Sequence, residues 1–361
     1  MQGGVVSTIA SFCAVSAVLT AAFCAYAQVF GRVMHLVDEP DGVRKLHGRA
    51  TPLVGGLAIL LPSFAVSFFY LIERHDGAFM PIAVLASALM LVVGVLDDRF
   101  DVSPLWRLAS FLLITWGVFA ARPLFVLHAL HFDLPGFELN VALGVLAVPI
   151  TTVTVIGFIN AANMADGMNG QLMGSLAIWC LFIARHLGIE SGIPFLTVTA
   201  SAAAALCFNL RGKLFSGSSG SYAASFLVAL GAIAAYRQSE GAMPAQLPVF
   251  WFWLPVLDCL RVMTGRMLEG HSPFSGDRNH FHHILLETLR PSLALGGYLG
   301  LLALPGIVAE FDLSLGGATL IVCMFVYAAL ILSRQLRLTR DAGAEAGQKP
   351  AFAQSNSAPQ P

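Results

Sequence analysis

The sequence predicts an all-α fold: a polytopic bundle of about eleven transmembrane helices, with the N-terminus outside and the C-terminus in the cytoplasm. Three observations support this prediction. The chain of 361 residues is 57% hydrophobic and only 11% charged, with a mean hydropathy of +0.76, whereas soluble domains carry about 25% charged residues. Apolar runs of bilayer-crossing length recur along the chain, and Lys and Arg gather in alternate loops.

A helix that crosses a bilayer needs about 20 mostly apolar residues. The runs that approach this length are 5–27, 53–72, 79–96, 108–127, 141–160, 171–189, 193–209, 221–236, 246–260, 293–310 and 315–333. No Lys or Arg precedes the first run, so we expect a retained span rather than a cleaved signal peptide. We expect residues 1–340 to form one transmembrane domain and 341–361, rich in Ala, Gly, Gln, Ser and Pro, to form a disordered tail.

Orientation follows from the distribution of basic residues, which favour cytoplasmic loops. With the N-terminus outside, only Arg74, Arg122, Arg185 and Arg237 fall in outside loops. The inside loops and the C-terminal segment hold the rest: Arg32, Arg44, Lys45, Arg49, Arg99, Arg107, Arg211, Lys213, Arg261, Arg266, Arg278, Arg290, Arg334, Arg337, Arg340 and Lys349. This asymmetry supports both the number of spans and an inside location for the polar loops.

The first inside loop carries a cationic cluster of Arg44, Lys45 and His47, followed by Gly55-Gly56 at the start of the next span. Cationic side chains bind phosphate oxygens, and paired glycines let a backbone approach a ligand closely. The alternative is a basic loop that only fixes the topology.

The third span ends in the adjacent acids Asp97 and Asp98. Neighbouring carboxylates repel each other, and each charge near hydrocarbon costs about 3 kcal/mol. A divalent cation or a cationic substrate group would relieve this cost. The alternative is an ordinary pair of acids at a helix end beside Arg99.

The loop after the fifth span is rich in amides and glycines and contains Asn163 and Asp166. Their hard oxygen atoms suit Mg²⁺ that bridges a diphosphate, although Asn, Asp and Gly also form ordinary turns. The loop at 215–221 consists of Phe215 followed by Ser and Gly, and its N–H groups could hold an anion at a helix start. A flexible linker has the same composition.

The last inside loop is the richest in functional groups, with Arg278, His280, His282 and His283 close together. Their N–H groups can bind or neutralise phosphate oxygens, and in a helix His280 and His283 share a face. A zinc site and a solvated polar loop are the alternatives.

Together, metal-binding oxygens and basic loops beside a lipid phase indicate phosphoryl transfer between a soluble nucleotide and a lipid-borne acceptor. The net charge of −1 gives no indication of nucleic-acid binding. A transporter would need charges near the middle of its spans and often shows two related halves, and the sequence has neither feature.

The motifs VDEPDGVRKLHG, PLVGG, GVLDDRFDVS, INAANMADGMNG and GHSPFSGDRNHFHHIL occur in this order between about Val37 and Leu286. In these motifs the chain resembles the polyprenyl-phosphate N-acetylhexosamine-1-phosphate transferases, the WecA/MraY superfamily, and most of all the WecA-type branch. The resemblance implies that the phosphate of undecaprenyl phosphate attacks the β-phosphate of a UDP-N-acetylhexosamine, with GlcNAc as the first choice of sugar. UMP leaves, and a lipid-linked surface glycan is started.

The resemblance also implies roles for single residues. One of Asp97 and Asp98 orients or deprotonates the lipid phosphate. Asp166 is an essential catalytic acid, and Asn163 and Asp166 lie at the metal, Mg²⁺ with Mn²⁺ as the alternative. The groups that would bind the nucleotide and its diphosphate are Arg44, Lys45, His47, Phe215 (stacked on uracil), Arg278, His280, His282 and His283. A bacterial inner-membrane location, a site that faces the cytoplasm and possible homodimers are further expectations.

One departure from the family pattern concerns the metal. The family's F-x-G-D-x-G-S element reads here Phe215-Ser216-Gly217-Ser218-Ser219-Gly220-Ser221, so that Ser218 replaces a carboxylate. A hydroxyl is a poorer Mg²⁺ ligand than a carboxylate. This favours a second hypothesis, a weakened or inactive paralogue that binds lipid phosphate or partner proteins, unless Asp166 or Asp258 supplies the missing charge.

Overall fold

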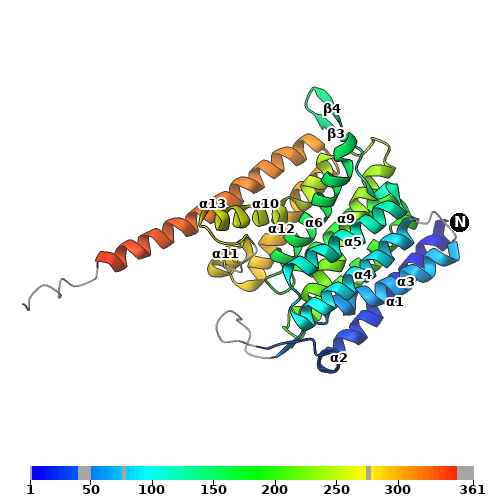
Figure 1. Ribbon diagram of the computed structural model, residues 1–361, viewed down its shortest axis with the longest axis horizontal. Helices are drawn as coiled ribbons and strands as arrows, with labels where there is room; N and C mark the ends of the chain where they lie inside the picture. The colour runs from blue at the N-terminus through cyan, green and yellow to red at the C-terminus, as the bar shows by residue number, and fades with distance from the viewer. Residues whose placement is uncertain (1, 40–49, 75–78, 274–277, 348–361) are drawn as a thin grey trace, which may run out of the picture.

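The computed structural model describes residues 2–39, 50–74, 79–273 and 278–347. Within these ranges the chain is a bundle of α-helices with two small antiparallel hairpins (Figure 1). The helices are α1 (Gln2–Ala25), α2 (Ala27–Met34), α3 (Gly55–Arg74), α4 (Phe79–Phe100), α5 (Pro104–Ala121), α6 (Ala147–Ala165), α7 (Gln171–Ser191), α8 (Ile193–Asn209), α9 (Gly217–Gln238), α10 (Gln246–Leu268), α11 (Phe281–Thr288), α12 (Pro291–Ala309) and α13 (Leu313–Gly347).

Each of the eleven apolar runs predicted from the sequence coincides with one long helix, which confirms a polytopic helical architecture. Eight of these helices, α1, α4, α5, α6, α9, α10, α12 and α13, are long and apolar enough to cross a membrane. Shorter apolar helices cover Gly55–Leu71 in α3 and Ile193–Asn209 in α8. Helix α7 is interrupted by non-helical backbone at Gly188. The number of spans and the orientation of the termini stay predictions.

Helix α9 is the central element of the bundle, since 94% of its span is buried, against 17% for α1 and for α13. It packs against α3, α4, α6 and α7. Its Ala, Ser and Gly side chains are small, and small residues let helix backbones approach closely in a membrane protein. A Cβ atom added to Gly94 of α4 would lie 2.3 Å from the Cα atom of Ser219, which shows how closely the two helices approach.

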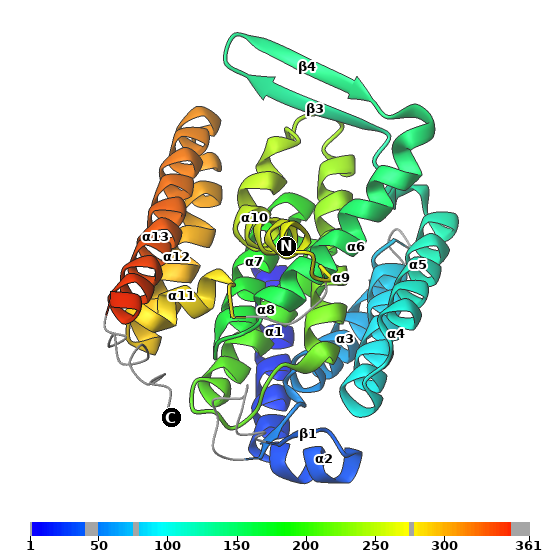
Figure 2. The ribbon, with the colours of Figure 1, turned by 60° about the vertical axis from the view of Figure 1, so that its left-hand side comes forward.

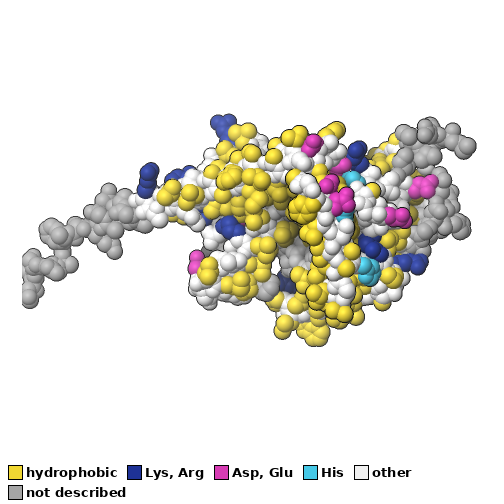
Figure 3. Space-filling view, turned by 90° about the horizontal axis from the view of Figure 1, so that it is seen from above, with side chains coloured by type: hydrophobic (Ala, Val, Ile, Leu, Met, Phe, Trp, Pro, Cys, Tyr) yellow, Lys and Arg dark blue, Asp and Glu magenta, His cyan; other side chains and the backbone are white. Residues whose placement is uncertain are grey.

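The two ends of the bundle differ in structure. The hairpin of β3 (Ala129–Leu134) and β4 (Phe137–Ala142) lies at one end, and α2 and α11 lie toward the other (Figures 1 and 2). Seen from the hairpin end, acidic and histidine side chains gather on one part of a largely apolar surface (Figure 3). The second hairpin, β1 (Val37–Asp38) with β2 (Thr51–Pro52), flanks the segment 40–49, which lies outside the described residues.

Candidate functional site

Four segments that are far apart in the sequence meet at the end of the bundle opposite the β3–β4 hairpin. They are the C-terminal ends of α4 and α6, the segment 215–221 at the start of α9, and the segment 278–283 at the start of α11. Direct contacts join them: α4 to α9 through Asp98, α6 to α9 through Asn163, and the loop after α6 to α11 through Gly167. These segments carry most of the polar groups predicted to form one site.

Asp98 is held at the N-terminus of α9. Its Oδ1 atom accepts the backbone N–H of Ser218 at 2.7 Å, and its Oδ2 atom accepts that of Ser219 at 3.0 Å. The free N–H groups and the dipole of a helix N-terminus favour an anion there. Gly217 adopts a φ of +70°, and a Cβ atom at this position would lie 2.5 Å from Oδ2 of Asp98. Glycine is therefore required where the carboxylate meets the helix.

The small-residue loop was expected to hold a ligand anion, and in this structure two of its N–H groups hold the carboxylate of Asp98 instead. The N–H groups of Gly55 and Gly56, expected to lie near a ligand, donate to the carbonyl oxygens of Phe215 at 2.8 Å and Ser216 at 2.9 Å. The close approach that the two glycines allow is thus between α3 and the start of α9.

Asp97 has different partners from its neighbour. The hydroxyl of Tyr222 donates to its Oδ2 atom at 2.8 Å, and Arg107 forms an ion pair with the same atom at 3.2 Å. The guanidinium of Arg107 also donates to the hydroxyl of Tyr222 at 3.2 Å. Asp97 is 7% exposed, so its charge is neutralised inside the protein. Sequence reasoning missed Tyr222, since a tyrosine in an apolar run gives no signal of its own.

Asn163 and Asp166 extend the site from the end of α6. The Oδ1 atom of Asn163 accepts the hydroxyl of Ser221 at 2.6 Å. Burial above all, with a smaller contribution from the charge of Asp98, raises the pKa of Asp166 to about 7 against the opposing hydrogen bonds from Ser216 and the backbone N–H of Leu172. Asp98 and Asp166 therefore belong to one region of the site.

These oxygens are of the kind that suits a divalent cation. A cation would compensate the charges of Asp98 and Asp166, and Asn163, which contacts Ser221 at the start of α9, supplies an amide oxygen. Among the described residues, no three His, Cys, Asp or Glu side chains form a metal-binding group. A cation bound here would complete its coordination with amide, hydroxyl, water or phosphate oxygens, as Mg²⁺ does at phosphate-binding sites.

The histidine segment reaches this region through His282. A Cβ atom on Gly167, which follows Asp166, would lie 1.9 Å from Nε2 of His282, so the imidazole packs directly against the glycine. Burial, and to a lesser degree the charges of His283 and His280, lower the pKa of His282 to about 3. The ring centroids of His282 and His283 lie 4.2 Å apart. His282 is therefore a neutral, buried imidazole against Gly167, the residue that follows Asp166.

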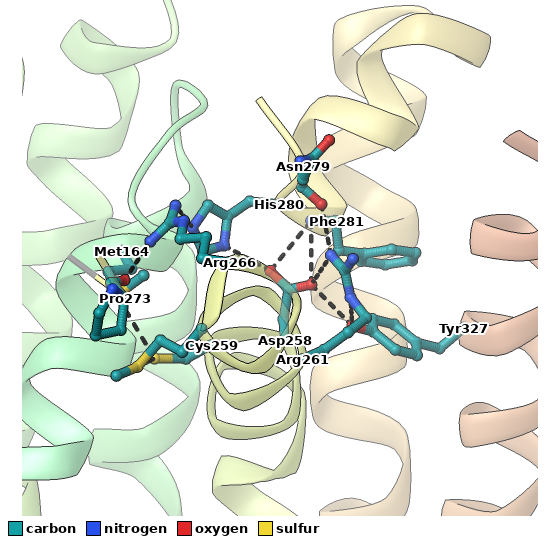
Figure 4. A network of polar contacts seen from close by, with 11 residues as sticks. Met164, Asp258, Cys259, Arg261, Arg266, Pro273, Asn279, His280, Phe281 and Tyr327 are labelled. Carbon is teal, nitrogen blue, oxygen red and sulfur yellow. Dashed lines mark hydrogen bonds and ion pairs between the residues drawn. The ribbon is translucent and has the colours of Figure 1, made fainter. Parts of the chain in front are cut away.

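The remaining predicted residues lie as follows. His280 is 5% exposed and contacts Asp258 of α10 (Figure 4). Phe215 is half-buried, and its N–H donates to the carbonyl of Pro52 at 2.8 Å. Arg278 is exposed and His283 half-buried. Arg44, Lys45 and His47 lie outside the described residues.

Known proteins resemble the chain over most of its length. Residues 80–236 match the family model described as glycosyl transferase family 4. The chain is 30% identical over 302 residues to the undecaprenyl-phosphate alpha-N-acetylglucosaminyl 1-phosphate transferase of Yersinia pestis, over 76% of this chain and 77% of that protein. The enzyme of that name from Escherichia coli K12 is 28% identical over 322 residues, 81% of this chain and 82% of that protein. A probable enzyme of this type from Bacillus subtilis is 26% identical over 312 residues, 83% of each chain.

Proposed function

Because the chain belongs to glycosyl transferase family 4, we propose that it transfers an N-acetylhexosamine 1-phosphate group, GlcNAc in the first instance, from a UDP-sugar to undecaprenyl phosphate. UMP is the second product, and the lipid diphosphate sugar starts a cell-surface glycan. The observation that carries the proposal is the convergence of Asp98, Asn163, Asp166 and His282 at one end of an apolar bundle. Relatives that cover most of the chain are named undecaprenyl-phosphate alpha-N-acetylglucosaminyl 1-phosphate transferases, which supports the acceptor and the transferred group.

The chemistry asks the protein to bring two anions together and to stabilise the charge that moves between them. In the proposal, a phosphate oxygen of the lipid attacks the β-phosphorus of the UDP-sugar, and the bond from that phosphorus to the bridging oxygen breaks, so that this oxygen leaves with UMP. One of Asp97 and Asp98 would orient or deprotonate the lipid phosphate at the inner end of α4. Asn163 and Asp166 would hold Mg²⁺, or Mn²⁺, which supplies charge neutralisation of the diphosphate when bound.

The donor would bind through the other proposed residues. Phe215 is half-buried between the start of α3 and the start of α9, where an aromatic ring can stack on uracil. Arg278, His282 and His283 belong to the segment that reaches the site from α11 and would bind the diphosphate, while His280, predicted to bind with them, is buried against Asp258. Arg44, Lys45 and His47 would add positive charge from the first inside loop. The protein would lie in the bacterial inner membrane, and its site would face the cytoplasm, which contains the nucleotide sugar.

The test is UMP release by the purified, full-length protein from a panel of UDP-HexNAc donors with undecaprenyl phosphate. We expect release with UDP-GlcNAc in the presence of Mg²⁺ or Mn²⁺ and none after chelation by EDTA. Omission of the lipid phosphate is the control, because it distinguishes transfer from simple hydrolysis. Absence of UMP release with every donor of the panel would refute the proposal.

A second candidate function rests on Ser218, whose hydroxyl stands where the family pattern has a carboxylate. It is a weakened or inactive paralogue that binds lipid phosphate or partner proteins. Ser218→Asp separates the two. A large gain in turnover would support the weakened paralogue. An active wild-type protein with no gain on this substitution would support a site that is organised around Asp98 and Asp166.

A further inference from the structure

A buried polar network joins the histidine segment to α10 and α13 (Figure 4). Asp258 of α10 lies at its centre and is 3% exposed. Its carboxylate contacts His280 Nδ1 at 2.9 Å, Arg261 Nη2 at 2.7 Å and the Tyr327 hydroxyl at 2.8 Å. It also accepts the backbone N–H of Phe281, at 3.1 and 3.2 Å from its two oxygens.

These partners occupy both oxygens of Asp258. Oδ1 contacts Arg261, Tyr327 and the N–H of Phe281, and Oδ2 contacts His280 and the same N–H. A carboxylate has about four acceptor positions, and a buried one is stable only when they are used. Asp258 is therefore committed to protein groups, and its role is to hold them in place rather than to bind a ligand.

The network also specifies which nitrogen of His280 carries the proton in the neutral ring. A nitrogen that faces a carboxylate at 2.9 Å must donate, so Nδ1 carries the hydrogen. Nε2 lies 3.5 Å from Nη2 of Arg266. A guanidinium only donates, so Nε2 must be the acceptor there. Arg266 donates in addition to the carbonyl of Pro273 at 2.7 Å. Both contacts favour the same tautomer.

The same carboxylate fixes the start of α11. Phe281, whose N–H it accepts, is the first residue of this helix, and His282 and His283 follow at once. The rings of His280 and His282 are nearly parallel, with an interplanar angle of 3° and centroids 5.8 Å apart. A displacement of His280 or of the start of α11 would therefore move His282 away from Gly167 and Asp166.

We propose that Asp258 is a positioning residue, which fixes the Nδ1–H tautomer of His280 and anchors the start of α11 so that His282 and His283 face the diphosphate of the donor. Arg261 of α10 and Tyr327 of α13 hold Asp258 itself in place. The proposal assigns His280 to the support of the site, beneath its two neighbours. It rests on the proposed function for the identity of the ligand, but not for the geometry.

The first test is spectroscopic and needs no substrate. Asp258→Asn keeps the shape of the side chain but can turn an N–H group toward His280, which then must accept at Nδ1 and carry its proton on Nε2. The tautomer is measured by NMR of ¹⁵N-histidine-labelled full-length protein in detergent, with the His280 signals identified by their loss in His280→Gln. We expect Nδ1–H in the wild type and Nε2–H in Asp258→Asn. The same tautomer in both proteins, or Nε2–H in the wild type, would overturn the proposal.

The second test is kinetic. Asp258→Asn should lower kcat about 100-fold, the effect expected when groups at a reacting centre are misplaced by roughly 1 Å. Tyr327→Phe keeps the carboxylate but removes one donor to it, and should shift the His280 signals and lower kcat by a smaller factor. If Asp258→Asn does not fold, Tyr327→Phe provides the test. In that case, a wild-type kcat and unchanged His280 signals in Tyr327→Phe would contradict the proposal.

A matched control is present at the other end of the bundle. Glu310 is also a carboxylate that contacts a histidine and an arginine, His186 at 2.9 Å and Arg185 at 2.8 Å. Glu310→Gln should leave both the tautomer of His280 and kcat unchanged, and an equal loss of kcat would overturn a specific role for Asp258. If the wild type shows no UMP release while the tautomers behave as expected, only the proposed function fails.

Discussion

At the residue scale, Asp98 and Asp166 face the same region of the site but differ in their surroundings. Asp98 accepts two backbone N–H groups at the start of α9, so its loss would leave the start of a helix without an acceptor. Asp166 follows the end of α6, and its charge is disfavoured because its pKa is raised to about 7, chiefly by burial. Both carboxylates are proposed to serve the reaction, and only Asp98 holds a helix start. The two roles can be separated by experiment.

We predict that Asp98→Ala lowers both activity and stability, with a loss of about 1–2 kcal/mol because two N–H groups of α9 lose their acceptor. Asp166→Asn should lower turnover about 100-fold or more but leave the melting temperature equal to or above that of the wild type in EDTA. Thermal unfolding and UMP release measured on the same samples test both. A large drop in melting temperature for Asp166→Asn would show that its carboxylate supports the fold.

The sequence predicts that amides and carboxylates gather at this end of the bundle, because polar groups are costly in hydrocarbon and fall at the ends of apolar runs. Their partners could not. Tyr222 and Tyr327 lie inside apolar helices, where an aromatic residue is most often part of the packing. The signal that points toward Asp258 is a lone acid within an apolar helix, and only the structure identifies His280 as its partner.

At the element scale, the site depends on how closely α9 approaches its neighbours. A Cβ atom on Gly56 of α3 would lie 2.2 Å from the Cα atom of Gly220. Both atoms belong to main chains that cannot rotate away, so a methyl group there must push the helices apart. The start of α9, which carries the contacts to Asp98 and Asn163, would move with it.

Gly56→Ala should therefore destabilise the protein by about 1–3 kcal/mol through overpacking and lower its activity. The matched control is Gly296→Ala in α12, where an added Cβ atom meets nothing within 4 Å. That substitution should be neutral or stabilise the helix by up to about 1 kcal/mol. The measurement is thermal unfolding of both variants in one detergent. Equal melting temperatures would show that α3 and α9 can separate at no cost.

The long helices were predictable because a run of about 20 apolar residues that crosses a lipid bilayer almost always forms an α-helix. Shorter elements were not found. The predicted span at 141–160 overlaps the end of β4 and includes most of α6, which runs from Ala147 to Ala165. The signal for the hairpin was present: Leu130, Phe132 and Leu134 alternate with other residues before a Pro-Gly turn. A search for long apolar runs considers the mean hydropathy of a segment, and the mean does not reveal alternation between apolar and polar residues.

At the scale of the whole molecule, the two ends of the bundle differ in their content of basic residues. The end that carries the site holds the loops predicted to be inside, which contain most of the described Lys and Arg residues. At the hairpin end, β3 is tied to the helices by the N–H of Ala245 and the hydroxyl of Tyr236. Positive charge favours the cytoplasmic face, so the site end should be inside.

Labelling of single cysteines in a background without the six native ones tests this orientation. Cysteine in place of Glu138 in β4 should react with a membrane-impermeant maleimide in intact spheroplasts. Cysteine in place of Lys213, between α8 and α9, should react only after permeabilisation. Both positions are exposed, so access decides the result. The reverse pattern would invert the predicted topology and place the site outside.

The hydrogen bonds between Asp98 and the start of α9 affect which inhibitors can bind the site. The helix N-terminus at the proposed site would be a natural target for a phosphonate or carboxylate inhibitor, but the N–H groups of Ser218 and Ser219 already hold the carboxylate of Asp98. An anionic compound aimed at them must displace that acid and accept its repulsion. Compounds that present a chelating group to a metal ion held by Asp166 and Asn163 would not have to displace that acid, and selection for potency should enrich them.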